Sequence, residues 1–167
     1  MASGDIDGMP GDEIVVGAGA GGGPHVRTFK LLNGSIQQIG GPLGSFFAYD
    51  ESFTGGVNVA VGNYDGLSGD EIITGAGMFG GPHVKVFSGT GLLASFFAFP
   101  DDGRLGVSVA AGDVDGDGRA EILTGSGVGG GTGETTAGGD RRVTVGAQET
   151  DRRNNQWIAY PTPPPRQ

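Results

Sequence analysis

The sequence predicts an all-β fold, a partial β-propeller of four-stranded antiparallel blades with about two and a half repeats, which one chain does not close. Three observations lead to this prediction: an internal repeat of about 50 residues, apolar runs of strand length, and 37 Gly and 9 Pro among 167 residues. Without a period, so much Gly and Pro would indicate disorder. With the period, these residues mark recurring turns.

The repeat is visible as direct identity. Residues 13–26 (EIVVGAGAGGGPHV) match residues 71–84 (EIITGAGMFGGPHV) at ten of fourteen positions, with an offset of 58. Residues 121–131 match the second copy at seven of eleven positions, with an offset of 50. We therefore divide the chain into three repeats and a tail. Repeat 1 (1–54) begins at an acidic loop and has a longer hairpin loop at 30–44, repeat 2 (55–104) is a complete blade, and repeat 3 (105–131) is partial. The divergent tail (132–167) is expected to be mostly flexible.

Each repeat contains short runs of β-branched and aromatic residues between Gly, Asn or Pro, a pattern typical of strands. Asn33-Gly34, between apolar residues, predicts a tight hairpin. No stretch offers ten helical residues without Gly. The expected strands, in chain order, are 14–16, 26–29, 46–47, 57–61, 72–74, 84–87, 96–97, 107–110 and 122–124, and residues 142–145 are a candidate strand in the tail.

Several aromatic residues and two histidines recur with the same period. His25 and His83 hold equivalent positions, each after Pro at the start of a strand, so we expect packing or hydrogen bonding rather than metal binding. We interpret the recurring phenylalanines as core between blades: Phe29, Phe46, Phe47, Phe87, Phe96, Phe97 and Phe99.

Composition excludes several classes of function. With 10 basic and 19 acidic residues, the net charge of −9 argues against binding to nucleic acid phosphates. The absence of Cys excludes disulfides, a thiolate nucleophile and Cys-ligated zinc. No apolar run approaches the ~18 residues of a membrane span, so we expect no membrane insertion. The first residues contain neither a basic nor an apolar segment, so no signal peptide is visible.

The acidic stretch at residues 113–121 (DVDGDGRAE) is the most informative segment. Its side chains at positions 1, 3 and 5 of a tight loop, Asp113, Asp115 and Asp117, can converge on one ion. Hard oxygen ligands in this number suit Ca²⁺. An EF-hand would need Glu at position 12, where this chain has Thr124. The alternative is that Asp and Asn simply favour turns, because they bond to their own backbone.

This loop, together with the turn Phe79-Gly80-Gly81-Pro82, resembles FG-GAP repeats, the β-propeller blades of integrin α subunits and of many bacterial surface and secreted proteins. The resemblance covers roughly residues 4–131. It implies that each loop joins the first two strands of a blade and binds Ca²⁺ on one face of the propeller. In the third loop it implies four side-chain ligands and one carbonyl: Asp113, Asp115, Asp117, Glu121 and the carbonyl of Arg119.

The two other loops depart from this pattern. Residues 5–13 (DIDGMPGDE) have Met and Pro at positions 5 and 6, and residues 63–71 (NYDGLSGDE) have Leu and Ser there, with Asn at position 1. Each loop has lost at least one carboxylate, so we expect weaker sites with affinities of ~10⁻⁴–10⁻³ M. Their candidate ligands are Asp5, Asp7 and Glu13 in the first loop, and Asn63, Asp65 and Glu71 in the second.

The repeats also match the dinucleotide pattern G-x-G-x-x-G at residues 17–22, 75–80 and 125–130. That site needs a helix after the glycines. Since Pro-His-Val at 24–26 and 82–84 begins a strand, we assign these glycines to tight turns and close packing. No set of catalytic residues emerges, so the sequence does not predict an enzyme.

We therefore expect a calcium-stabilised, non-catalytic binding or adhesion module, located outside the cell or on its surface by family resemblance, with an unidentified protein or glycan ligand. One alternative is a structural unit that self-assembles into homo-oligomers, or a fragment of a longer protein whose further repeats complete the propeller. Another is a glycan-active enzyme on a propeller scaffold, which would need a residue set at the axial opening that differs between repeats.

Overall fold

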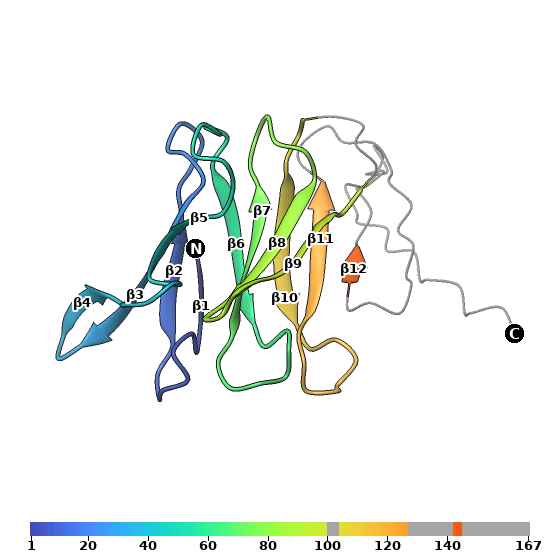
Figure 1. Ribbon diagram of the computed structural model, residues 1–167. Coiled ribbons are helices and arrows are strands. Elements are labelled where there is room, and N and C mark those ends of the chain that lie inside the picture. The colour runs from blue at the N-terminus through green and yellow to red at the C-terminus, as the bar shows by residue number, and fades with distance from the viewer. Residues whose placement is uncertain (100–103, 127–141, 145–167) are drawn as a thin grey trace, which may run out of the picture.

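The computed structural model describes residues 1–99, 104–126 and 142–144, and in these residues it contains three β-sheets and no helix (Figure 1). The predicted all-β class is confirmed, and so is the antiparallel pairing within the sheets, apart from one parallel pair described below. Since the described residues form no helix, none of them makes a helix that could cross a membrane.

The first sheet contains β1 (Ala2–Gly4), β2 (Glu13–Gly17), β3 (His25–Leu32), β4 (Ser35–Gln38) and β5 (Ser45–Phe47). The first half of β3 pairs with β5 and its second half with β4. The β3–β4 turn is the predicted hairpin, with positive φ of 51° at Asn33 and 77° at Gly34, as a type I′ turn requires. β1 was not predicted, because three small residues give no strand signal.

The second sheet has the simple order β6 (Val57–Gly62), β7 (Glu71–Ala76), β8 (His83–Ser88) and β9 (Gly91–Phe97). The third contains β10 (Val107–Gly112), β11 (Glu121–Ser126) and β12 (Arg142–Thr144). The candidate strand in the tail is thus present, but it pairs with β11 in parallel. The remaining residues of the expected tail lie outside the described part of the chain.

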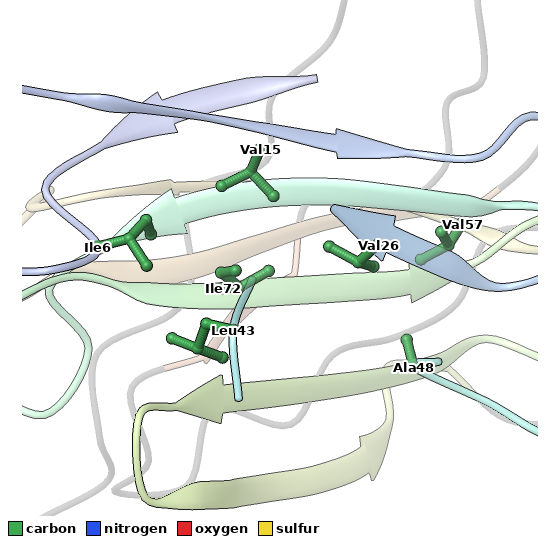
Figure 2. Close-up of a cluster of buried hydrophobic side chains, with 7 residues drawn as sticks. All are labelled: Ile6, Val15, Val26, Leu43, Ala48, Val57 and Ile72. Atoms are coloured by element: carbon green, nitrogen blue, oxygen red, sulfur yellow. The ribbon is translucent and has the colours of Figure 1, made fainter. Parts of the chain in front are cut away.

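Two apolar clusters hold the three sheets face to face. Side chains alternate between the faces of a strand, so β7 places Ile72 in one cluster and Ile73 in the other. The cluster between the first and second sheets is drawn in Figure 2 and comprises Ile6, Val15, Val26, Leu43, Ala48, Val57 and Ile72. The cluster between the second and third sheets comprises Ala60, Ile73, Val84, Val86, Phe99, Val107 and Ile122.

Glycines in the second strands of the first and second sheets, β2 and β7, permit this close packing. A Cβ added at Gly17 would lie 2.3 Å from the carbonyl oxygen of Val57, and one at Gly75 would lie 2.5 Å from that of Val107. Any larger residue would push the neighbouring sheet away. This confirms the packing role that the sequence analysis assigned to these glycines.

Two of the phenylalanines expected in the core lie at the surface instead. Phe47 is 46% exposed and Phe97 is 62% exposed. Each stacks on the histidine opposite it in the sheet, His25 or His83, with ring centroids 4.8 Å apart. The two histidines also lie 2.8 Å from Ser45 Oγ and Ser95 Oγ, respectively, which confirms their packing and hydrogen-bonding role.

A tyrosine adds polar contacts between the first two sheets. The hydroxyl of Tyr49 lies 2.7 Å from the carbonyl oxygen of His83, to which it donates, and 3.3 Å from Thr74 Oγ1. The equivalent residues between the second and third sheets are Phe99 and Thr124. Thr124 Oγ1 is buried and has no hydrogen-bond partner among the described residues.

This pair of interfaces allows a reciprocal test. We expect Tyr49→Phe to lower the free energy of unfolding by about 1–2 kcal/mol, because it leaves buried acceptors unsatisfied. We expect Phe99→Tyr to raise the melting temperature, because the new hydroxyl would pair with Thr124 Oγ1. Thermal denaturation of both variants measures this, and equal destabilisation by the two changes would contradict it.

Candidate metal centre

The three acidic loops, residues 5–12, 63–70 and 113–120, join the first and second strands of successive sheets and lie at one common edge of the stack (Figure 1). In each loop the fourth residue is a glycine with positive φ: 70° at Gly8, 76° at Gly66 and 81° at Gly116. A side chain would be strained in this conformation. The loops therefore share one backbone turn, even though their remaining residues differ.

A buried glutamate follows each loop, at the start of the second strand. Glu13, Glu71 and Glu121 are only 2%, 4% and 5% exposed. In each case Oε2 accepts a hydrogen bond from the backbone N–H of the second loop residue, at 2.9 Å from Ile6, 2.8 Å from Tyr64 and 2.9 Å from Val114. In the first two loops it also accepts one from the third residue, at 3.2 Å.

These contacts give the glutamates a role that the sequence analysis missed. They were predicted as metal ligands, but one oxygen of each braces the loop backbone. This carboxylate holds loop residue 2 in all three loops, and residue 3 as well in the first two. The side chains around them therefore project from a fixed turn.

In the third loop, the three aspartates converge as predicted. Carboxylate oxygens of Asp113, Asp115 and Asp117 lie within 4.8 Å of one another, and all three residues are exposed. Asp113 accepts from the backbone N–H groups of Gly116 at 2.7 Å and Gly118 at 2.9 Å. Each carboxylate oxygen has a further lone pair for a cation.

The other two predicted ligands of this loop are placed differently. Glu121 lies at the buried base, outside this group of aspartates. Arg119 donates its backbone N–H to Asp117 Oδ1 at 3.0 Å, so its main chain belongs to the same turn. The donor set of three carboxylates fits Ca²⁺, a hard cation that takes oxygen ligands.

The second loop closes on an amide. Asn63 Oδ1 accepts from the backbone N–H of Gly66 at 2.7 Å, and its Nδ2 donates to the carbonyl oxygen of Leu67 at 2.9 Å. Asp65 Oδ1 accepts from Leu67 N–H at 2.8 Å. Both ends of the Asn63 side chain are therefore engaged within the loop, which has a neutral amide where the others have a carboxylate.

The first loop gathers three carboxylates and a lysine. Oxygens of Asp5, Asp7 and Glu13 lie within 4.8 Å of one another. The ammonium group of Lys30 donates to Asp7 Oδ2 and lies 3.9 Å from Glu13 Oε1. This hydrogen bond lowers the pKa of Asp7 and raises that of Lys30. Asp5 Oδ1 is buried and has no hydrogen-bond partner among the described residues.

Neighbouring loops are also joined to one another. Asp5 donates its backbone N–H to Asp70 Oδ2 at 3.0 Å, and Asp70 N–H donates to the carbonyl oxygen of Asp5 at 2.5 Å. Ala120 N–H donates to the carbonyl oxygen of Asn63 at 2.6 Å. Burial raises the pKa of Asp70, whose carboxylate faces the first loop. The acidic loops of the first and second sheets, and those of the second and third sheets, are thus joined by hydrogen bonds, in the same way as the sheets themselves are in contact.

The brace at Glu71 makes a prediction about pH. Burial raises the pKa of Glu71 above its ordinary value of 4.5. Its ionisation therefore costs the folded chain stability as the pH rises through the interval above 4.5. We expect Glu71→Gln, whose amide oxygen still accepts, to flatten the pH dependence of the melting temperature in chelator from pH 4.5 upward. Glu71→Ala should lower stability by about 1–3 kcal/mol, because it leaves two N–H groups unpaired. Indistinguishable pH profiles for wild type and Glu71→Gln would contradict this.

Comparison with known proteins finds one family match, and it includes the third loop. The family model of the FG-GAP repeat matches residues 105–140, the segment that contains β10, the third loop and β11. No curated protein and no solved structure matches the chain. The resemblance to FG-GAP repeats is thus confirmed for residues 105–140, and it suggests a β-propeller-type module.

Proposed function

We propose that this chain is a calcium-stabilised, non-catalytic FG-GAP-like binding or adhesion module of a secreted or cell-surface protein, with a protein or glycan as its ligand. The observation that carries the proposal is the convergence of Asp113, Asp115 and Asp117 within 4.8 Å in the segment that matches the FG-GAP model. FG-GAP repeats occur generally in extracellular or surface proteins, which supports the location.

Calcium would act in this loop by stabilising the fold. Three carboxylates this close repel one another, and a divalent ion bound by Asp113, Asp115 and Asp117, with the carbonyl of Arg119, would remove that repulsion. Because the loop joins β10 to β11, an ion bound only by the folded loop stabilises the whole sheet. Glu121 would contribute by holding the loop backbone through Val114.

One cavity away from the acidic loops is a candidate surface for such a ligand. A cavity of about 510 Å³ is lined by parts of β6 and β10 and by the residues that follow β2 and β7, with Asn58 and Ser108 among its lining residues. The remaining lining residues are glycines and residues with apolar side chains, so a ligand there would meet mainly backbone and apolar groups.

A thermal melt tests the calcium proposal. At a Ca²⁺ concentration about 100 times the Kd, we expect a stabilisation of about 2.7 kcal/mol relative to chelator. Mg²⁺ should give less, because it demands strict octahedral coordination. Asp115→Ala should abolish the calcium-induced rise in melting temperature. Glu51→Ala, which removes an exposed carboxylate outside the loops, should retain it. An unchanged calcium response in Asp115→Ala would exclude the third loop as the site.

A second candidate function, assembly with another copy of the chain, is favoured by the outer face of the first sheet. In the second sheet, Ile72 and Thr74 are fully buried, and Ile72 belongs to the apolar cluster formed with the first sheet. The equivalent residues of the first sheet, Ile14 and Val16, are 37% and 36% exposed. The outer face of the first sheet thus corresponds to the face of the second sheet that packs against the first. A sheet of the same type from a second copy of the chain could therefore pack on it in the same way.

Sedimentation velocity tests this assembly. We expect a concentration-dependent increase in sedimentation coefficient for the wild-type chain, which Val16→Lys abolishes by placing a charge on the outer face. Leu92→Lys, a matched change of an exposed aliphatic residue in β9, should leave it intact. A wild-type chain that stays monomeric at all concentrations would rule out this function.

A further inference from the structure

We propose that the ammonium group of Lys30 takes the place of the metal ion in the first loop, so that this loop is held without calcium. The inference rests on the proposed calcium role of the third loop. It goes further because it states that the first loop, which has a similar set of carboxylates, is neutralised by a side chain of the protein and not by a bound ion.

The position of Lys30 follows from the register of the sheet. Ile14 of β2 pairs with Phe29 of β3, so the next residue of β3, Lys30, lies opposite Glu13 at the end of the loop. From there its ammonium group donates to Asp7 Oδ2 and lies 3.9 Å from Glu13 Oε1. A side chain from a strand of the same sheet therefore brings a positive charge to two of the three clustered carboxylates.

The second repeat lacks this cation at the same place. Ile72 pairs with Phe87, so the residue opposite Glu71 is Ser88. Ser88 is buried, and its hydroxyl lies 2.8 Å from Thr90 Oγ1, within the β8–β9 turn. It is too short and uncharged to replace an ion. In that repeat the loop instead has the neutral Asn63 at its first position, which lowers the negative charge.

Lys30 therefore accompanies a specific charge pattern. The first loop has Asp at positions 1 and 3 and is contacted by Lys30 of β3. The second loop keeps Asp65 at position 3, but it has Asn63 at position 1, and β8 has Ser88 where β3 has the lysine. The equivalent position in the third repeat lies outside the described residues. Calcium could enter the first loop only by breaking the contact between Lys30 and Asp7, although the buried Asp5 Oδ1 would favour such an ion.

Calcium stoichiometry, measured by isothermal titration, tests this assignment. The measurement uses the full chain carrying Asp115→Ala, so that the third loop does not contribute. We expect Lys30→Ser, which installs the residue of repeat 2, to bind one more Ca²⁺ per chain than the Asp115→Ala chain alone. Lys30→Arg, which keeps the charge, should gain none. Adding Asp7→Ala to the Lys30→Ser chain should remove the gained site.

Thermal melts keep the test valid if Lys30→Ser folds poorly. Lys30→Gln preserves most of the side-chain length, and we expect its melting temperature to fall in chelator and to recover in millimolar Ca²⁺. The inference is overturned if neither variant gains calcium, or if the Asp115→Ala chain with Lys30 intact already has a calcium site that Asp7→Ala removes. The proposed calcium function fails separately, if the wild-type third loop binds no Ca²⁺.

Discussion

The hydrogen bonds from loop backbone to a buried glutamate are the contacts on which the loop edge depends. The carboxylate is anchored at the first residue of β2, β7 or β11, and it holds the start of each loop in one conformation. With the backbone held in this way, the residues at the first and fifth positions can vary, whereas the third is Asp in every loop. One loop then presents three aspartates, another an asparagine amide, and another aspartates with Lys30. A common turn thus carries three different arrangements of charged and neutral side chains.

Packing between the sheets and geometry at the loop edge form one connected system. The second strands, β2 and β7, approach the neighbouring sheet closely because Gly17 and Gly75 have no Cβ. This approach brings successive loops within backbone hydrogen-bond distance, as the contacts of Asp5 with Asp70 and of Asn63 with Ala120 show. A change in the spacing of the sheets would therefore be transmitted to the loops.

Local pattern was sufficient to predict most of the strands, β1 excepted, and the Asn33-Gly34 hairpin, because they depend on residues near in sequence. The convergence of three aspartates in the third loop was also predictable from their spacing. The hydrogen bonds from the loop backbone to the buried glutamates were not predictable, because a metal ligand and a hydrogen-bond acceptor look the same in the sequence: both are a carboxylate. Phe47 was misassigned because recurrence with the period does not tell which face a residue occupies. The contact of Lys30 with Asp7 joins residues 23 positions apart, so local pattern could not predict it. The alignment of the two repeats does place Lys30 at the position of Ser88, and this difference in charge was a signal available in the sequence.

The burial of β7 on both faces has a consequence for how the molecule opens. Each sheet is stabilised mainly by itself and by its immediate neighbours, as in other repeat architectures. The six residues of β7 are all buried, between one apolar cluster and the next. Hydrogen exchange should therefore be slowest at the amides of this strand and faster in the sheets on either side, since opening at the centre requires both interfaces to separate. Local unfolding would then begin in the outer sheets and reach the middle sheet last.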